Sequence, residues 1–436
     1  METSLKLKKA TQHLWTFTIS KLISTFGASV YTFGISFYIL SITGSATSFA
    51  TNLLCSLLPR IIIGPFAGYA ADKYSKKMIV IVAQIASILA MGGLVIVTMT
   101  SGITLTAIYL TTILLSMTSS FSGITFSSAI TNLVDEERIQ KAMSFNQMSV
   151  SIASIGGPAV GGLMYGLVSL EAFLLVHLVA YILAVALEAT MNFKLYTKIV
   201  EDKASEVKES MLQNMKAGLT YLRKHQLLSL IVWVSLLLNF LFAAFNVGFA
   251  YMLIEILQVK SQHFGFAEGA LPVGMLLMAF LLSIRKQIRF PLHTAKWSLL
   301  INGVLFSATT LPLFVSMSYP MIVGFYITLM LLMGITLTLC NTPMGVLMQQ
   351  TIEEAYKGRV FGLLETMSMG LMPFGMILFG FLFDAVKPEW IMLTCGLLLL
   401  VVILYFLRPS IIRKAHPEII EKLPKASNNS PVISSE

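Results

Sequence analysis

The chain has 436 residues, of which 56% are hydrophobic and only 12% are charged. Soluble domains carry about 25% charged residues, and one bilayer-spanning helix needs about 20 apolar ones. This composition excludes a disordered regulator and an ordinary soluble enzyme, and it predicts roughly a dozen membrane spans. The net charge is +9, but the basic residues do not form a soluble basic domain. A nucleic-acid-binding protein is therefore also excluded.

Apolar runs bounded by polar or glycine-rich breaks follow one another along the chain. Because unpaired backbone groups are costly in hydrocarbon, each long run is predicted to be a helix rather than a barrel strand. Six runs precede an interruption and six follow it, which predicts an all-α membrane protein with 12 transmembrane helices in two six-helix bundles. The runs cover residues 14–40, 47–70, 78–99, 103–127, 142–167, 171–191, 227–252, 263–285, 296–317, 319–343, 361–384 and 390–408.

The polar breaks divide the chain into four parts. Within the longest break, apolar residues at helical spacing over Met211–Lys224 predict an amphipathic helix on the membrane surface. A shift that brings Met148 onto Met367 aligns similar segments, as expected for two pseudo-symmetric halves. The predicted parts are an N-terminal half, a linker, a C-terminal half and a tail, at residues 1–191, 192–226, 227–408 and 409–436.

The basic residues are distributed unevenly between the two sides of this predicted fold. With the N-terminus in the cytoplasm and 12 spans, the cytoplasmic segments hold 26 of the 30 Lys and Arg residues. The outer segments hold Lys260 and Lys387, and Lys21 and Arg60 lie within spans. Since positive charge accumulates on the cytoplasmic side of membrane proteins, both termini are predicted to be cytoplasmic.

A tight basic turn joins the second and third runs. Its sequence, Gly68-Tyr-Ala-Ala-Asp72-Lys73-Tyr-Ser-Lys76-Lys77, resembles the signature loop of the major facilitator superfamily. The glycine allows close helix approach, the aspartate can meet the positive end of a neighbouring helix, and the lysines hold the turn in the cytosol. In that family the loop latches the two halves in one access state, so the resemblance implies a conformational gate at Gly68, Asp72, Lys73, Lys76 and Lys77. An ordinary positively charged loop is the alternative.

The fifth run contains a glycine-proline motif, Gly156-Gly157-Pro158-Ala-Val-Gly161-Gly162. It resembles the motif typical of exporters in the same superfamily. Gly157 and Gly161 are four residues apart, which clears one helix face for close packing, and Pro158 allows bending. The resemblance implies a hinge-like surface that favours export and includes Gly162; generic close packing is the alternative.

Further segments, including Thr43-Gly44-Ser45-Ala46 and Asn341-Thr-Pro343, resemble the branch that contains macrolide efflux proteins and siderophore exporters. The branch implies a monomeric exporter in the bacterial cytoplasmic membrane that exchanges an amphiphilic small molecule for protons. Many of these exporters have an arginine in span four, where Leu115 stands here. Proton exchange must therefore use other groups, or the coupling differs. A lysolipid flippase and a membrane sensor with the same fold remain alternatives.

Charged residues inside spans are costly and usually mark pathways. Lys21 and Arg60 lie in the first half, and Glu268 and Glu365 lie in the second. We expect them to line or flank a central cavity, where a carboxylate exchanges a proton and the cations attract an acidic group or pair with the carboxylates. Interfacial positions for Lys21 and Glu365, and a structural ion pair for Arg60, are the alternatives. Glu188 lies at a span end and is predicted to be interfacial.

Polar groups without charge complete the predicted pathway. Asn239 and Asn246 are seven residues apart and share a helix face, as do Tyr31 and Tyr38. They suit an amphiphilic organic solute or, equally, hydrogen bonds between helices. No phosphate-binding loop, metal-ligand cluster or hydrolase motif occurs in the sequence, so neither enzymatic activity nor a cofactor or metal is expected. His177 is predicted to be a core histidine.

Overall fold

The computed structural model describes residues 2–408 apart from residues 194, 197–218, 286–287, 353–359, 361–363 and 365–366. Twelve of its helices are long and apolar enough to cross a membrane. The predicted all-α class and the number of spans are therefore confirmed.

The described helices fall into an earlier and a later group along the chain. The earlier group is α1 (Glu2–Thr43), α2 (Ala46–Lys73), α3 (Lys76–Ser101), α4 (Leu105–Leu133), α5 (Glu136–Leu167) and α6 (Leu170–Ala189). The later group is α8 (Gln226–Tyr251), continued by the π-helix η1 (Met252–Ile256), then α9 (Ser261–Ser283), α10 (Pro291–Ala308), the short α11 (Leu311–Phe314), α12 (Tyr319–Thr351), α14 (Met372–Ala385) and α15 (Pro388–Phe406).

Hydroxyl side chains and prolines begin many of these helices. Ser45, Thr104 and Ser169 each accept a hydrogen bond from a backbone N–H in the first turn of α2, α4 and α6. Proline stands in the first turn of α10, α12, α14 and α15, where its missing N–H has no intrahelical partner to lose. The polar breaks in the sequence therefore coincide with helix starts for a local chemical reason.

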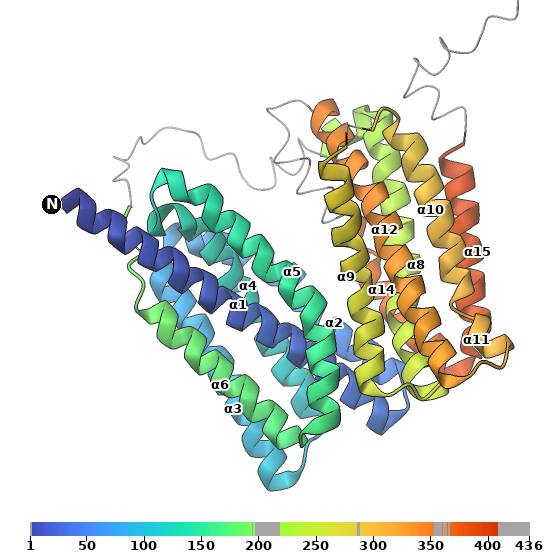
Figure 1. The fold of residues 1–436 in the computed structure, drawn as a ribbon, viewed down its shortest axis with the longest axis horizontal. Helices are drawn as coiled ribbons and strands as arrows, with labels where there is room; N and C mark the ends of the chain where they lie inside the picture. Colours follow the sequence, from blue (N-terminus) through green and yellow to red (C-terminus); the bar gives the residue numbers. More distant parts are fainter. Residues whose placement is uncertain are drawn as a thin grey trace, which may run out of the picture.

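Two bundles are arranged side by side as a V (Figure 1). Within the N-terminal bundle α1 packs against α5 and α6, and α4 packs against α2 and α3. Within the C-terminal bundle α12 packs against α9 and α10, and α8 packs against α14 and α15. Across the V the main contacts are α5 with α9 and α2 with α14.

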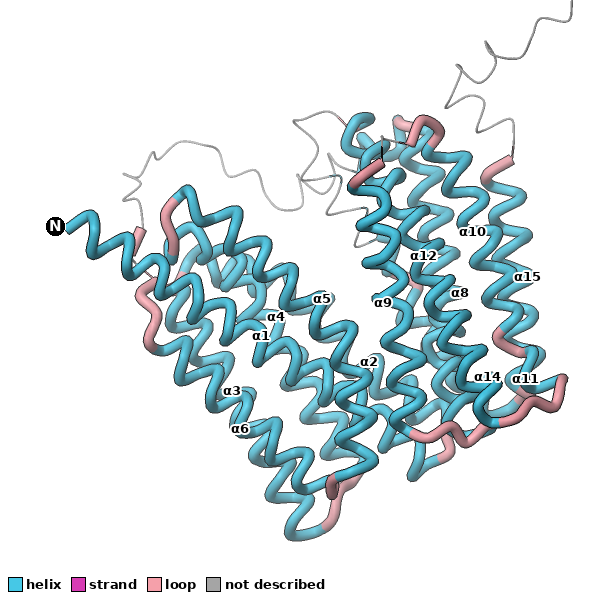
Figure 2. The backbone as a smooth tube through the Cα atoms, in the orientation of Figure 1, coloured by secondary structure: helices cyan, strands magenta, loops and turns pink. Residues whose placement is uncertain are grey.

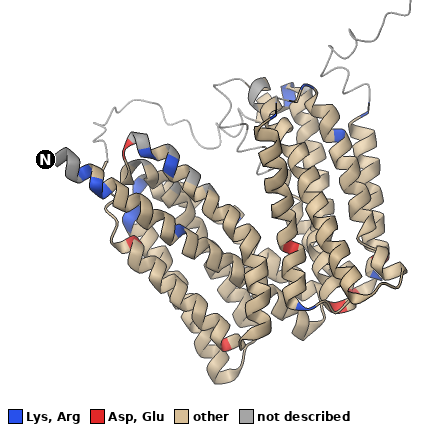
Figure 3. Ribbon diagram, viewed as in Figure 1, with Lys and Arg blue, Asp and Glu red and all other residues tan. Residues whose placement is uncertain are grey.

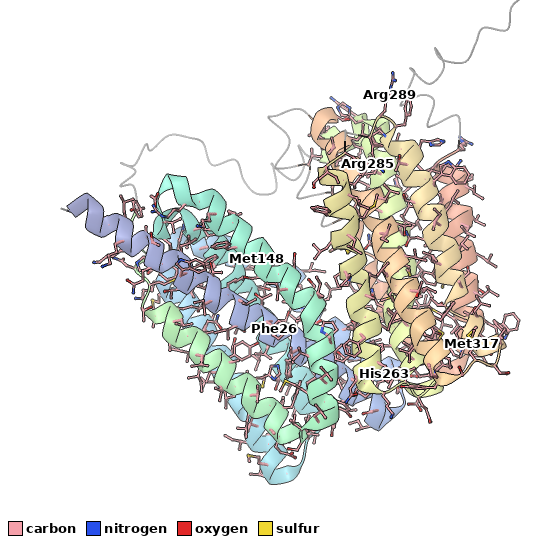
Figure 4. The ribbon with its side chains drawn as sticks, in the orientation of Figure 1. Phe26, Met148, His263, Arg285, Arg289 and Met317 are labelled. Atoms are coloured by element: carbon pink, nitrogen blue, oxygen red, sulfur yellow. The ribbon has the colours of Figure 1, made fainter. Side chains whose placement is uncertain are left out.

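The two ends of the V differ in charge and in separation. Figure 3 shows that most of the Lys and Arg residues drawn in blue lie at the end where α1 begins, here called the basic end. Along α9, His263 lies near the other end, here called the opposite end, and Arg285 follows the helix at the basic end (Figure 4). The bundles meet at the opposite end and diverge toward the basic end (Figure 2).

The largest hydrophobic core belongs to the C-terminal bundle but extends into the N-terminal one. Phe33, Phe37, Ala46 and Phe49 of α1 and α2 join this core, whereas two smaller cores lie within the N-terminal bundle alone. The predicted linker falls largely outside the described residues. Residues 219–224 are helical, and the rest of the predicted amphipathic helix is not described.

Candidate functional site

The contact between α5 and α9 includes a close approach of the two backbones. A Cβ atom at Gly162 would overlap the carbonyl of Ser261, and one at Gly265 would overlap the carbonyl of Pro158. At Gly269 a Cβ would lie 2.9 Å from the carbonyl oxygen of Ile155. The two halves therefore touch here at a distance that only glycine permits.

The glycines of the predicted exporter motif contact two other helices, α1 and α9. Gly157 packs against Ser29 of α1, and a Cβ at Gly161 would lie 3.0 Å from the carbonyl oxygen of Val30 on the same helix. Gly162, the next residue, faces α9 of the other half. The motif thus clears two adjacent faces of α5, one toward its own bundle and one toward the partner bundle.

A carboxylate from one half caps a helix of the other half. Asp384, at the end of α14, accepts hydrogen bonds from the Oγ of Ser45 at 2.8 Å, the backbone N–H of Ala46 at 2.7 Å and that of Thr47 at 3.0 Å. These donors are at the N-terminus of α2, where free N–H groups and the helix dipole favour an anion. We call this contact the Asp384 latch.

Aromatic rings fill the space beside these contacts. Phe33 of α1 stacks on Phe264 of α9 with ring centroids 5.2 Å apart, and Phe37 approaches the same ring at 6.1 Å. Phe249 of α8 lies on the other side, 5.9 Å from Phe264. Phe33, Phe37, Phe249 and Phe264 are all buried and form what we call the aromatic seam between the halves.

At the basic end the predicted gate motif contacts only its own bundle among the described residues. Lys76 Nζ donates to the carbonyl of Ser128 at 2.6 Å, and Lys77 Nζ donates to that of Ala189 at 2.8 Å. Lys73 is exposed and lies near the ring of Tyr69. A Cβ at Gly68 would meet no atom within 4 Å, so the expected close helix approach is absent in this conformation. Asp72 is helical, and its side chain is outside the described part.

The charged residues predicted within spans are divided between the halves. Lys21 of α1 is half-buried and interacts electrostatically with both Arg60 of α2 and Glu188 of α6. Arg60 is exposed. Glu268 is half-buried on α9 and makes no hydrogen bond or ion pair with any other described residue. Lys21 and Arg60 are thus within electrostatic range of each other, and neither is paired with Glu268; Glu365 lies outside the described residues.

The uncharged polar residues take different positions. Asn239 donates to the carbonyl of Ser235 in its own helix, and Asn246 is exposed. Tyr31 is buried against the ring of His177. His177 bridges α6 and α1, with Nδ1 2.8 Å from the carbonyl oxygen of Phe173 and Nε2 2.9 Å from that of Gly27. His177 is therefore a buried core residue, as predicted.

The sequence did not predict the environments of two carboxylates, Glu188 and Asp384. Glu188 lies at a span end as predicted, in the last turn of α6, but it is not at an exposed surface: it is only 1% exposed and accepts hydrogen bonds from Ser20 and Gln84. These two polar residues inside apolar runs were the available signal for a buried partner. Asp384 stands at a span end like many interfacial acids, and nothing local in the sequence connects it with Ser45.

Comparison with known proteins identifies the family. A family model described as Major Facilitator Superfamily matches residues 17–372. Macrolide efflux protein A of Streptococcus pyogenes is 24% identical over 399 residues, which cover 89% of this chain and 94% of that protein. The Staphyloferrin A transporter of Staphylococcus aureus is 22% identical over 357 residues, which cover 79% and 83%.

Solved structures show the same fold. The crystal structure of a bacterial homologue of the iron transporter ferroportin, in an inward-facing state, superposes with a TM-score of 0.67 at 16% identity. The match covers 91% of this chain and 99% of that one. The chain is thus a multi-pass integral membrane protein, and it belongs to the Major Facilitator Superfamily of transporters.

Proposed function

We propose that this protein exports an amphiphilic small molecule from the bacterial cell by alternating access, in exchange for protons. The observation that carries the proposal is the asymmetry of the V. The opposite end is held by the glycine contact, the Asp384 latch and the aromatic seam, whereas the bundles diverge at the basic end. This is the arrangement expected of one access state of a two-state transporter.

The distribution of charge indicates to which side of the membrane this conformation is open. The basic end is assigned to the cytoplasm because positive residues accumulate on that side of membrane proteins. The conformation is then open toward the cytoplasm, and both termini are cytoplasmic. A Ser75→Cys variant tests the assignment, because Ser75 is exposed in the turn between α2 and α3. An impermeant maleimide should label it in inverted vesicles and not in intact cells; the reverse pattern contradicts the orientation.

The surroundings of the diverging region favour an amphiphilic compound. Met148 of α5 is 48% exposed and lies beside the space between the halves (Figure 4). Methionine adapts to varied apolar shapes, and the exposed side chains of Arg60 and Asn246 provide a polar group on each bundle. The relatives named for macrolide efflux and for staphyloferrin A transport support a drug or a secreted metabolite as substrate, and thus a role in drug resistance or metabolite release.

Proton exchange is assigned to a carboxylate of the C-terminal half, Glu268 or Glu365, because both are ionisable residues within predicted spans. Span four has no arginine that could take this role. Leu115 stands there and is buried in a hydrophobic core.

The decisive experiment measures radiolabelled erythromycin in cells that lack their own efflux pumps. Cells with the protein should accumulate less compound, and a protonophore should abolish the difference. In proteoliposomes, the Glu268→Gln, Glu365→Gln double variant should lose coupling to a pH gradient; retained coupling rules out these carboxylates. Movement of lysophospholipid alone would identify a flippase, and no transport of any probe would identify a sensor.

A further inference from the structure

A buried carboxylate lies inside the N-terminal bundle, in the last turn of α6 near the basic end. Glu188 of α6 is 1% exposed. Its Oε1 accepts a hydrogen bond from the Oγ of Ser20 on α1 at 2.6 Å and from the Nε2 of Gln84 on α3 at 3.2 Å. The same amide nitrogen lies 3.5 Å from the Oγ of Ser122 on α4. Helices α1 and α3 thus bind the carboxyl group of α6 directly, and α4 is linked to it through Gln84.

The second oxygen of this carboxyl group has no partner in the described part of the chain. Glu188 Oε2 is buried and has no hydrogen bond with any described residue. Ser20, Gln84 and Ser122 are themselves buried, so the side chains around the carboxyl group are shielded from water. A buried polar oxygen without a partner requires an explanation, and a bound proton or small cation is one.

The charges around Glu188 do not neutralise it in this conformation. On α1, Lys21 interacts with it electrostatically but lies beyond ion-pair distance, and Arg60 of α2 acts on Lys21 in turn. On α3, Lys77 donates instead to the carbonyl of Ala189. On α4 the uncharged Ser122 accepts a hydrogen bond from Gln84 and brings no cation to the carboxylate. An ionised carboxylate that is buried without a paired cation is strongly disfavoured.

We propose that Glu188 is a second proton-binding site of the transporter, occupied in the conformation seen here and emptied when α1 moves Lys21 against the carboxylate. The proton leaves Oε2 for water at the basic end, and the ammonium group of Lys21, already charged, then compensates the anion. This inference rests on the proposed exchange of protons, and it places one proton site in each half.

Helix α1 provides the physical link from this site to the contact between the halves. Ser20 and Lys21 lie on the same helix as Phe33 and Phe37, which pack on Phe264 of the other bundle. Separation of the aromatic seam therefore moves the helix that carries both a donor to Glu188 and its nearest cation. Protonation and the position of the halves are coupled because each favours one position of α1.

Infrared spectroscopy of the full chain in lipid nanodiscs tests the site directly. Spectra at stepped pH from about 5 to about 9 should show the C=O stretch of a protonated carboxyl group that persists above neutral pH, beyond the range of ordinary glutamates. The band should lose intensity in Glu188→Gln, in which the carboxyl groups of Glu268 and Glu365 remain, and keep its full intensity in Glu171→Gln, a matched change at the other end of α6. An identical band in wild type and Glu188→Gln overturns the proposal.

A second variant keeps the test independent of folding defects in the first. Lys21→Met removes the compensating cation, so the band should persist to a pH about one unit higher; an unchanged titration contradicts the role of Lys21. Loss of the band on addition of Na⁺ at constant pH would identify a sodium site and overturn the assignment to protons. Because this readout needs no transported compound, failure of erythromycin export counts against the proposed function alone.

Discussion

At the scale of single residues, the Asp384 latch shows how one side chain can join two halves of a transporter. The carboxylate accepts three hydrogen bonds, and two of them come from backbone N–H groups at the start of α2. Backbone donors at a helix N-terminus are fixed in direction, so they hold an anion without ordering a flexible side chain. The latch therefore stabilises the conformation in which the opposite end is closed.

Replacement of this carboxylate should shift the balance between conformations. In Asp384→Asn the hydrogen bonds lose their ionic character, and we expect a loss of about 1 kcal/mol, or roughly a fivefold change in the population ratio. Spin-label distances across the opposite end should report a larger open fraction. Glu389→Gln, on α15 at the same end, is the matched control and should leave the distances unchanged. An unchanged distribution in Asp384→Asn would mean that the latch has no energetic role.

Arg60 allows a second prediction at this scale. Its guanidinium is exposed and lies close enough to Lys21 for the two to interact. If this pair attracts acidic compounds, Arg60→Ala should weaken binding of anionic calcein about tenfold and leave cationic ethidium unaffected. Competition for export of each dye measures the change, with Lys387→Ala as the control. Equal effects on both dyes would exclude a selective role for this cation.

At the scale of elements, glycine decides which helices form the joint between the halves. On α5, Gly157 and Gly161 face α1, while Gly162 faces α9. On α9, Gly265 and Gly269 provide the complementary surface. Backbone contacts without interlocking side chains permit two helices to roll against each other, which suits a joint that must open and close.

Added methyl groups at this joint should impair transport more than they impair folding in general. In Gly162→Ala and Gly265→Ala the new Cβ atoms would overlap backbone carbonyls, and overpacking of this kind costs about 1–3 kcal/mol. We expect a large loss of export. Gly345→Ala in α12 is the control, because a Cβ there meets nothing within 4 Å. Export assays and thermal unfolding of all three variants check this; wild-type export in Gly162→Ala would exclude a close-packed joint.

The sequence predicts elements better than it predicts pairs of residues. Spans follow from local hydropathy, so all 12 were predicted, and the glycines of α5 were recognised by their spacing. Glu188 and Ser20 are 168 residues apart, and Asp384 and Ser45 are 339 apart. Which side chains meet over such separations depends on the rotation of each helix about its axis, and helices that are apolar on all sides do not specify that rotation.

At the scale of the whole molecule, the proposed cycle requires the two bundles to separate at the opposite end. The Oγ of Ser45 and the Oδ2 of Asp384 lie 2.8 Å apart across that boundary. A covalent bond between these positions would keep the end closed whatever happens at the basic end. Such a bond therefore tests directly whether transport requires the two bundles to separate at the opposite end.

A disulfide at these positions should stop export reversibly. The free cysteines Cys55, Cys340 and Cys395 are first replaced by alanine, and Ser45→Cys is combined with Asp384→Cys. Oxidation should abolish efflux and reduction should restore it, because the outward path opens only when the bundles part. The single Ser45→Cys variant should respond to neither treatment. Undiminished efflux by the oxidised double variant would contradict alternating access through this end.

The aromatic seam has a thermodynamic consequence for the transport cycle. Phe33, Phe249 and Phe264 are each no more than 6% exposed, so opening the opposite end removes large apolar surfaces from contact with each other. Hydration of apolar surface increases heat capacity, which makes both the enthalpy and the entropy of opening depend on temperature. The rate of efflux should consequently give a curved Eyring plot, and the curvature should decrease when Phe264 is replaced by alanine.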